Sequence, residues 1–413
     1  MPKVSKQEHG SINTKQARVN ARVKRFARHP ITIVAILLIV IVGAIVAVRA
    51  AGERKSVRFS LSGGSISGGA SDSNGSVAFG VGATSWWKPA QNTRWQWVLN
   101  GKVTTNELAR FDMYDVDLQS MVPAPTTQEV TWANGHKATI TWPKGTENPG
   151  MIQTLKSNGK KVICYIDTGA FEDYRPDASL FPGKWGAANN RAPSADGGGQ
   201  DLWGATVPYA GPPQYASLDV IGGDSEDSSG ASFSGEYWLD QRESAWKEVW
   251  GPIIWARLDL AKKLGCDGVE GDQNNAYGND TTFGATQAIS LRLYREFYYQ
   301  AHLRGLTAIS KNGIELTAQQ VTEPGTAAIS YCAPGLCVPD GILNEECQQY
   351  NECGDLDPAT SKGMWVGQVE YKGTTTSVCS GTNGANAKKR MAMKKPVTDP
   401  VDERISFACW ETP

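Results

Sequence analysis

Ligands for metals and loops for phosphates are scarce in this sequence of 413 residues. It has four histidines, and none of its eight cysteines form a pair at the C-x-x-C spacing. Structural zinc sites need about four such ligands, often closely paired. No glycine-rich phosphate loop follows any apolar run, which disfavours a doubly wound nucleotide-binding fold. We therefore expect no metal and no cofactor.

Negative charge is almost missing from the N-terminal part. Residues 1–58 contain 12 lysines and arginines but only 2 acids, a net charge of +10. The remaining residues contain 29 basic and 40 acidic side chains, a net charge of −11. An acidic body repels a phosphate backbone and attracts cations. We expect no nucleic-acid partner and favour a cationic ligand.

Long apolar runs are absent apart from one. "ITIVAILLIVIVGAIVAV", residues 31–48, is 18 residues without a charge, about the length that crosses a bilayer as a helix. The basic segment before it favours the cytoplasmic side. These features predict a cytoplasmic tail at 1–30 and a single-pass anchor at 31–50, with an extracellular body on the cell membrane. The alternative is secretion after cleavage of a signal peptide, since "VRA" at 48–50 could serve as a cleavage site.

The segment after this run is poor in large apolar residues. Residues 51–85 are rich in glycine and serine and predict a flexible stalk. The folded body then spans 86–413, which suits one barrel domain. Within it, residues 184–234 form a long glycine-rich insertion.

All eight cysteines follow the apolar run, and their even number on the exported side predicts disulfides. Sequence alone cannot assign the pairs. Close spacing makes Cys332–Cys337 and Cys347–Cys353 the expected local loops.

Short apolar runs alternate with helical patterns along the body. The amphipathic stretches 243–265 and 286–305 both end in helix-stop residues. Such alternation predicts a parallel α/β fold, and eight runs predict a (β/α)8 TIM barrel. The runs are at 95–100, 113–118, 161–166, 237–241, 266–272, 306–312, 341–346 and 364–371.

Polar residues gather at the C-terminal ends of seven of these runs. In a barrel these ends meet on one face, where catalytic groups lie, although a single strand-end acid often only caps a helix. So many acids predict a cleft lined with carboxylates, which fits a two-carboxylate glycoside hydrolase. The residues are Asp115, Asp117, Asp167, Asp240, Asp272, Lys311, Asn312, Glu345, Glu346 and Glu370.

Eight segments that span residues 95–372 carry a resemblance to a known family. They are "WQWVLNG", "MYDVDL", "GKKVICYIDTGAFEDYRPDA", "GEYWLDQR", "ARLDLAKKLGCDGVEGD", "AHLRGLTAISKN", "NEECQQYNEC" and "VEYK". In these segments and their order the body resembles glycoside hydrolase family 114, the endo-α-1,4-polygalactosaminidase barrels.

The resemblance implies a catalytic pair. The family's acid in V-E-P-D-N falls on Asp272, and the Glu of its N-E-Q-C falls on Glu345. We expect Asp272 to be the nucleophile or base and Glu345 the general acid, with the reversed roles as an alternative. One carboxyl must stay protonated and the other ionised, so Lys311 and Asn312 are expected to hold one pKa low.

The remaining predicted residues would contact substrate. For Asp117 and Asp115, which alternation places on one face, a basic partner such as Arg175 is the other option. The predicted contacts are Asp115, Asp117, Tyr165, Asp167, Asp240, Tyr277, Lys311, Asn312 and Glu370.

The chain departs from the family pattern near the first acid. Gly271 stands in place of the family's Pro, Gln273 in place of Asn, and Asn275 in place of a second Asp; Asp167 replaces a Ser. We expect a membrane-anchored, endo-acting hydrolase of α-1,4-linked galactosamine polysaccharide. The alternatives are a catalytically weakened carbohydrate-binding barrel and an endoglycosidase of another amino-sugar polymer.

Overall fold

The structure is a computed structural model that describes residues 85–183, 209–226, 232–325, 329–380, 386–387, 389–395 and 407–411. The predicted tail, anchor and all but the last residue of the stalk lie outside these ranges, as does 184–208 of the insertion. Within the ranges, no helix combines the length and the apolar character needed to cross a membrane.

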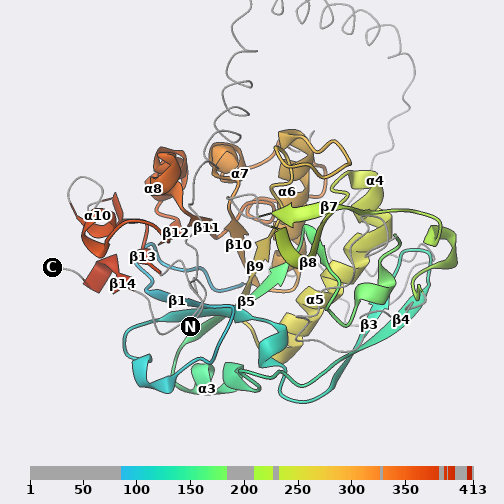
Figure 1. Ribbon diagram of the computed structural model, residues 1–413, viewed down its shortest axis with the longest axis horizontal. Coiled ribbons are helices and arrows are strands. Elements are labelled where there is room, and N and C mark those ends of the chain that lie inside the picture. The colour runs from blue at the N-terminus through green and yellow to red at the C-terminus, as the bar shows by residue number, and fades with distance from the viewer. Residues whose placement is uncertain are drawn as a thin grey trace, which may run out of the picture. The chain divides into compact units, whose positions relative to one another are not determined.

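The central sheet contains eight parallel strands that lie side by side in chain order. The sheet curls around a common interior, as Figure 1 shows, so the architecture is TIM-barrel-like. This order has no switch point, unlike that of a doubly wound sheet. The strands are β1 (Trp95–Val98), β2 (Met113–Asp117), β5 (Lys161–Asp167), β9 (Gly268–Asp272), β10 (Thr307–Lys311), β11 (Gly341–Glu345), β12 (Trp365–Glu370) and β13 (Ala392–Lys394).

Side chains connect the first and last of these strands. The Trp95 indole donates to the Met391 carbonyl at 2.8 Å, and Lys395 Nζ donates to the Trp97 carbonyl at 2.7 Å. In the described residues no backbone ladder joins β1 to β13, and the short strand β14 (Phe407–Ala408) pairs with β13 in the antiparallel sense.

Alternation along the strands separates the barrel interior from its outer face. One buried cluster draws its members from every second strand position and fills the barrel interior: Trp95, Trp97, Met113, Ile163, Ile309, Leu343, Trp365, Val369, Met391 and Met393. The intervening positions, such as Val162 and Val269, pack against the helices outside. The same alternation points Asp117, Asp272 and Glu345 into the interior at the C-terminal ends of the strands.

The expected strand at 237–241 is not part of the barrel. It belongs to β8 (Ser232–Leu239), which pairs in the antiparallel sense with β6 (Ala170–Glu172) and β7 (Ile221–Glu226) in a separate side sheet. The eighth barrel strand is β13, which the sequence did not predict because it has only three residues and no clear apolar alternation. A further hairpin consists of β3 (Thr126–Thr131) and β4 (Lys137–Trp142).

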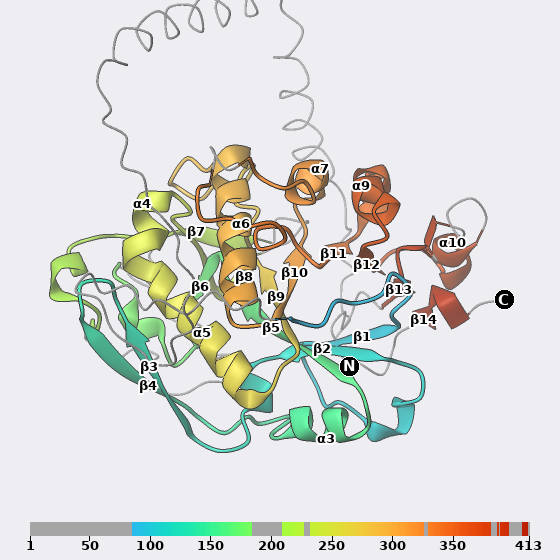
Figure 2. The same cartoon turned by 180° about the vertical axis from the view of Figure 1, so that it is seen from behind.

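Both expected long helices are present and cover the sheet from outside (Figure 2). The stretch 243–265 consists of α4 (Glu243–Ala245), a π-helical turn at Trp246–Trp250 and α5 (Gly251–Leu264), which ends at Gly265 with φ of 99°. This left-handed conformation favours glycine at a helix end. Helix α6 (Gln287–Leu303) begins after Thr286, whose side chain accepts the Ile289 amide.

The remaining helical elements are short. The α-helices are α3 (Met151–Ser157), α7 (Thr317–Gln320), α8 (Cys347–Tyr350), α9 (Asp357–Ser361) and α10 (Thr375–Cys379). Single 3-10 turns occupy Thr105–Glu107, Gln119–Met121, Ala178–Leu180, Pro213–Tyr215, Ile314–Leu316, Cys353–Leu356 and Cys409–Glu411.

All eight cysteines form disulfides. Both local loops that spacing predicts, Cys332–Cys337 and Cys347–Cys353, are confirmed. Two further bridges join distant segments: Cys164–Cys266 links β5 to the segment before β9, and Cys379–Cys409 ties α10 to the C-terminal turn.

The segment Trp86–Thr93, which we call the N-terminal strap, crosses the end of the barrel where the strands begin. Trp86 stacks on His302 of α6 at 4.1 Å and donates to Asp340 Oδ2 at 2.9 Å. The Trp365 indole donates to the Thr93 carbonyl at 3.0 Å. The described chain therefore enters at the end of the barrel opposite the strand-end carboxylates.

Candidate active site

A buried lysine holds three carboxylates together at the C-terminal ends of the strands. Lys311, the last residue of β10, is 1% exposed. Its Nζ lies 2.9 Å from Asp272 Oδ2, 3.0 Å from Glu345 Oε2 and 3.4 Å from Glu270 Oε1. Strands β9 and β11 flank β10 in the sheet, so adjacent strands deliver all four side chains to one point.

Asp272 ends β9 and is oriented by three donors. Besides Lys311, it accepts the Tyr165 hydroxyl at 3.2 Å and the Gln273 amide at 2.8 Å. Tyr165 belongs to the neighbouring β5, in the same alternation as Asp167, which pairs in register with Asp272. Both predicted contacts therefore lie beside this acid.

Glu345 ends β11 and is held from both sides. Asn312 Nδ2 donates to Oε2 at 3.1 Å, and the Tyr371 hydroxyl donates to Oε1. Burial acts to raise the pKa of Glu345, but Lys311, Tyr371 and Asn312 outweigh it and leave this pKa below its usual value. The site therefore keeps Glu345 ionised.

Two further acids lie deeper in the interior. Asp115 is 1% exposed, and burial together with the neighbouring Glu270 raises its pKa well above the usual value. Glu270 accepts the Trp97 indole at 3.1 Å, and Lys311 Nζ lies 4.7 Å from the centre of the Trp97 ring. Asp115 thus lies buried in the barrel interior, two residues before the end of β2.

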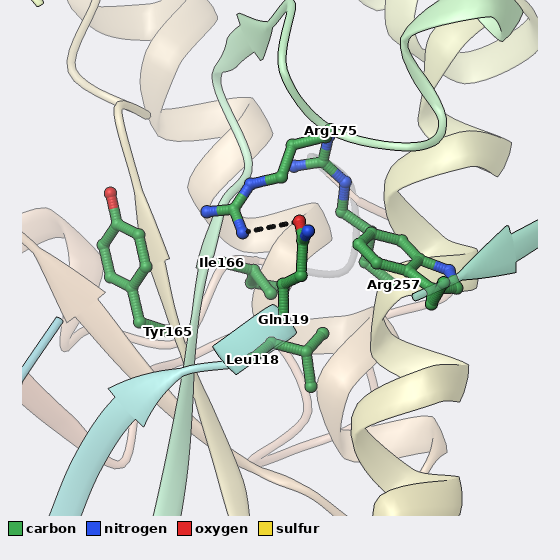
Figure 3. Close-up of a pocket in the computed structure, with 7 residues that line it drawn as sticks. Leu118, Gln119, Tyr165, Ile166, Arg175 and Arg257 are labelled. Atoms are coloured by element: carbon green, nitrogen blue, oxygen red, sulfur yellow. Dashed lines mark hydrogen bonds between the residues drawn. The ribbon is translucent and has the colours of Figure 1, made fainter. Parts of the chain in front are cut away.

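Asp117 has the basic partner that sequence analysis offered as an alternative to substrate. Arg175 Nη2 lies 2.7 Å from Asp117 Oδ2, and the Ser120 amide donates to Oδ1 at 2.8 Å. Arg175 also donates to Gln119 at 3.3 Å across a small pocket (Figure 3). The Tyr165 hydroxyl points away from Leu118 and Gln119 there. The pocket lining is Leu118, Gln119, Trp142, Tyr165, Ile166, Arg175 and Arg257.

A second acidic group lies beside Asp272, where the side sheet meets the barrel. Asp167 is fully buried, and Glu236 of β8 lies directly across the side sheet from Glu172 of β6. The Tyr174 hydroxyl lies within hydrogen-bond distance of both acids, 2.9 Å from Glu172 Oε1 and 2.8 Å from Glu236 Oε1. Burial and the Glu172 charge raise the pKa of Glu236 to about 8.

Three predicted contacts lie in other surroundings. Asp240 is bound by Arg242 at 2.6 Å. Tyr277 packs beside Gly313, where an added Cβ would lie 3.0 Å from its hydroxyl. Glu370 accepts the Gln348 amide at 2.9 Å and Gln368 Nε2 at 2.8 Å.

One trio of potential metal ligands occurs in the described chain: Cys347, Cys353 and Glu370. The two cysteines are joined in a disulfide, so they do not offer thiolates.

Four residues of the site were not among the predicted contacts: Glu270, Tyr371, Glu236 and Glu172. Glu270 could have been found from alternation, since it lies two positions before Asp272. Tyr371 ends the last apolar run. Glu236 lies in the recognised segment "GEYWLDQR", but only the side sheet brings it to Glu172.

The profile of glycoside-hydrolase family GH114 matches residues 77–405. The chain belongs to this family. It is therefore a glycoside hydrolase. No curated protein matches the chain.

The chain is also similar to solved structures. The chain is similar to Ega3 of Aspergillus fumigatus, solved in complex with galactosamine, with a TM-score of 0.51 and 22% identity over 80% of this chain and 100% of that one. It also matches the glycoside hydrolase domain of PelA from Pseudomonas aeruginosa, with a TM-score of 0.42 and 13% identity over 76% and 98% of the two chains. At these identities the likeness to Ega3 supports the shared fold alone.

The structure explains one departure of this GH114 member from the expected family pattern. A Cβ on Gly271 would lie 2.7 Å from Phe297 Cζ, so the α6 ring occupies the space that a larger residue would need. Gln273 follows with φ of 61°, a conformation that carries strain in a non-glycine residue. Its carbonyl accepts Gln241 Nε2 at 2.7 Å, which anchors the turn after Asp272.

Proposed function

We propose that this protein is an endo-acting glycosidase that cleaves α-1,4-linked galactosamine polysaccharide with Asp272 and Glu345 as its catalytic pair. The observation that carries the proposal is the shared contact of both carboxylates with Lys311 at the open end of the barrel. Family membership supports the reaction class, and the matched segments of the sequence support the substrate.

The spacing of the pair favours a retaining mechanism. Lys311 Nζ lies 2.9 Å from Asp272 Oδ2 and 3.0 Å from Glu345 Oε2, so these oxygens are no more than 5.9 Å apart, the sum of the two distances. Retaining glycosidases separate their carboxyls by about 5–5.5 Å, whereas inverting enzymes need about 6.5–9.5 Å to admit a water molecule.

The charges around Glu345 favour the reversed roles. Lys311, Asn312 and Tyr371 all stabilise its ionised form, which suits a nucleophile or base better than a proton donor. Asp272 would then be the acid. Azide rescue assigns the roles: an alanine variant of the nucleophile gives a glycosyl azide of inverted configuration, and a variant of the acid gives one of retained configuration.

Charge supports a cationic polymer as substrate. The chain after residue 58 carries 29 basic and 40 acidic residues, and Asp272 and Glu345 lie at the C-terminal ends of barrel strands. Partly deacetylated galactosamine carries ammonium groups near neutral pH, so the enzyme would attract it. The 31–50 segment would anchor the body outside the cell, which protease protection on intact cells would test.

The direct test is incubation of the full-length protein with a panel of amino-sugar polysaccharides. New reducing ends and early oligomers from the α-1,4-galactosamine polymer are the expected result. Cleavage of a different amino-sugar polymer would change the substrate assignment. Binding to the galactosamine polymer without new reducing ends would contradict the proposed activity.

A further inference from the structure

The loop between β9 and α6 contains a motif for N-linked glycosylation. Asn279, Asp280 and Thr281 form the triplet Asn-x-Thr, and the middle residue is not proline. Such a triplet is the acceptor signal for an N-linked glycan in a protein that passes through the secretory pathway of a eukaryotic cell. The sequence has one other Asn-x-Ser/Thr triplet, which begins at Asn74 and lies outside the described residues.

The folded chain exposes the acceptor residue to solvent. Asn279 is exposed at a turn in which its backbone amide donates to the Ala276 carbonyl at 3.1 Å. Gly278 before it and Asp280 after it are exposed as well. A glycan is bulky and hydrophilic, so its attachment point has to lie at the surface of the folded protein, as Asn279 does.

The Asn279 side-chain amide retains a hydrogen for substitution. Its Nδ2 donates to the Asn275 carbonyl at 3.2 Å, and a primary amide carries two N–H groups. Attachment of a sugar replaces one hydrogen and leaves the other to donate. The glycosylated side chain therefore keeps the hydrogen-bonding capacity that it uses in the unmodified protein.

The burial of Thr281 means that the motif is accessible only before the loop folds. Thr281 is 2% exposed, and its hydroxyl accepts the Phe283 amide at 3.3 Å. Strand β7 packs directly on the same segment, because an added Cβ on Gly222 would lie 2.1 Å from the Thr281 carbonyl oxygen. The transferase must therefore read the motif in the unfolded chain, whereas the glycan on Asn279 stays outside once the loop has folded.

The disulfides place the body in a compartment where this modification occurs. All eight cysteines are paired, and disulfides form in oxidising compartments such as the lumen of the endoplasmic reticulum. In a eukaryotic cell the same lumen contains the transferase and its lipid-linked oligosaccharide donor. The chain therefore meets both while it is still unfolded.

We propose that Asn279 carries an N-linked oligosaccharide. In the transfer, Asn279 Nδ2 forms a bond to the anomeric carbon of the sugar, and the bond from that carbon to a lipid diphosphate breaks. The lipid diphosphate leaves with the electron pair, Nδ2 loses one proton to solvent, and no oxidant or reductant takes part. Asn279 lies seven residues after Asp272 in the loop that follows β9, so the glycan stands at the end of the barrel that holds the proposed catalytic pair.

Peptide mass spectrometry of the full-length protein, made in a eukaryotic host, tests the site. Treatment with peptide-N-glycosidase in heavy-oxygen water converts a glycosylated asparagine to labelled aspartate. Fragmentation of the tryptic peptide 264–292 then distinguishes Asn279 from Asn274 and Asn275. We expect the label at Asn279 alone in this peptide. Recovery of the peptide only with unmodified Asn279, from protein whose cysteines are paired, overturns the proposal.

Variants link the glycan to the motif. In an Asn74→Gln background, which removes the other triplet, Thr281→Ser keeps the motif and Thr281→Ala destroys it without changing the acceptor. The gel shift that peptide-N-glycosidase removes should persist in Thr281→Ser and disappear in Thr281→Ala and Asn279→Gln. Asn134→Gln, at an exposed asparagine outside any such triplet, is the control and should keep the shift. A shift of unchanged size in Asn279→Gln, or no shift in the Asn74→Gln parent, contradicts the proposal.

Discussion

At the scale of single residues, the site depends on one buried cation surrounded by acids. Lys311 contacts Asp272, Glu345 and Glu270, and each would be a costly buried charge without it. The lysine was expected to hold one carboxyl pKa low and to contact substrate. In the structure it is 1% exposed, and it lowers the pKa of Glu345.

Substitution of either proposed catalytic carboxyl should abolish most activity. Asp272→Asn and Glu345→Gln each remove an essential charge or proton but almost no volume, so kcat should fall by on the order of 10²–10⁴-fold. Initial rates of reducing-end release measure this, and circular dichroism checks the fold. Near-normal turnover in either variant would mean that the residue is misassigned; Glu243→Gln is the surface control.

Replacement of Lys311 by a neutral residue should change the pH dependence of kcat/KM. In Lys311→Met the pKa of Glu345 rises, because burial remains and the main lowering influence is gone. If ionised Glu345 is required, activity is lost as pH falls through its pKa, so the acidic limb of kcat/KM should move to higher pH. Rates from pH 4 to 8 show the shift, with circular dichroism at each pH to separate unfolding. An unmoved acidic limb in a folded variant would contradict this role of Lys311.

At the scale of elements, the barrel is held at the end opposite the site by the N-terminal strap. Asp340 is the centre of this contact, where it accepts Trp86, His302 and the Ala308 amide and lies 3.0 Å from Lys88. Burial alone would raise its pKa, but His302 and Lys88 leave it lowered. The strap and α6 are therefore joined through one buried carboxylate.

Asp340→Ala should destabilise the protein by about 3–5 kcal/mol at pH 7, the usual cost of breaking a buried ion pair. A group whose folded pKa is lowered stabilises the fold above its unfolded pKa, near 4, and loses this effect as pH falls through the folded value. The difference between wild type and variant should therefore shrink below about pH 4. Denaturant unfolding at pH 7 and pH 3 measures it, and a difference that is constant with pH would contradict the assignment.

The disulfide after β11 should matter for catalysis as well as stability. Cys347–Cys353 closes a loop that starts two residues after Glu345, so loss of the bridge should lower kcat by loosening this acid. Cys332–Cys337 closes a loop of nearly equal size elsewhere and is the matched control. Double serine variants of both should cost about 2–3 kcal/mol, but only the first should lower kcat. Equal kcat values for the two variants would show that the bridge is purely structural.

At the scale of the whole molecule, the net negative charge of the body acts on a charged ligand over longer distances than any direct contact. The excess of acids after residue 58 attracts cationic chains, but solvent ions screen exposed charges over about 8–10 Å at physiological ionic strength. Buried contacts are screened much less. Raising the salt concentration should therefore weaken attraction by the surface charges more than binding inside the site.

The preference for deacetylated polymer should shrink as salt rises. Raising the salt concentration from about 0.05 to 0.5 M should lower kcat/KM on the cationic polymer more than on its acetylated form. Initial rates on both polymers at the two salt concentrations measure this. Equal rates, or a preference for the acetylated polymer that ignores salt, would mean that the acidic surface serves solubility and that the site recognises the acetamido group.

Local sequence pattern correctly predicted seven of the eight barrel strands, in chain order, and both long helices. The run at 237–241 has the same composition as a barrel strand, so only its antiparallel pairing with β6 reveals the side sheet. The β13 strand was missed because three residues carry too little periodicity.

Local sequence was sufficient for the features that depend on neighbours along the chain. The apolar runs placed Asp272 and Glu345 at strand ends, and short spacing predicted the two loop disulfides. Only the folded chain shows that Lys311 joins both acids at once and that Glu236 pairs with Glu172. These contacts join residues of different strands, and their energy depends on burial and distance, which no local spacing encodes.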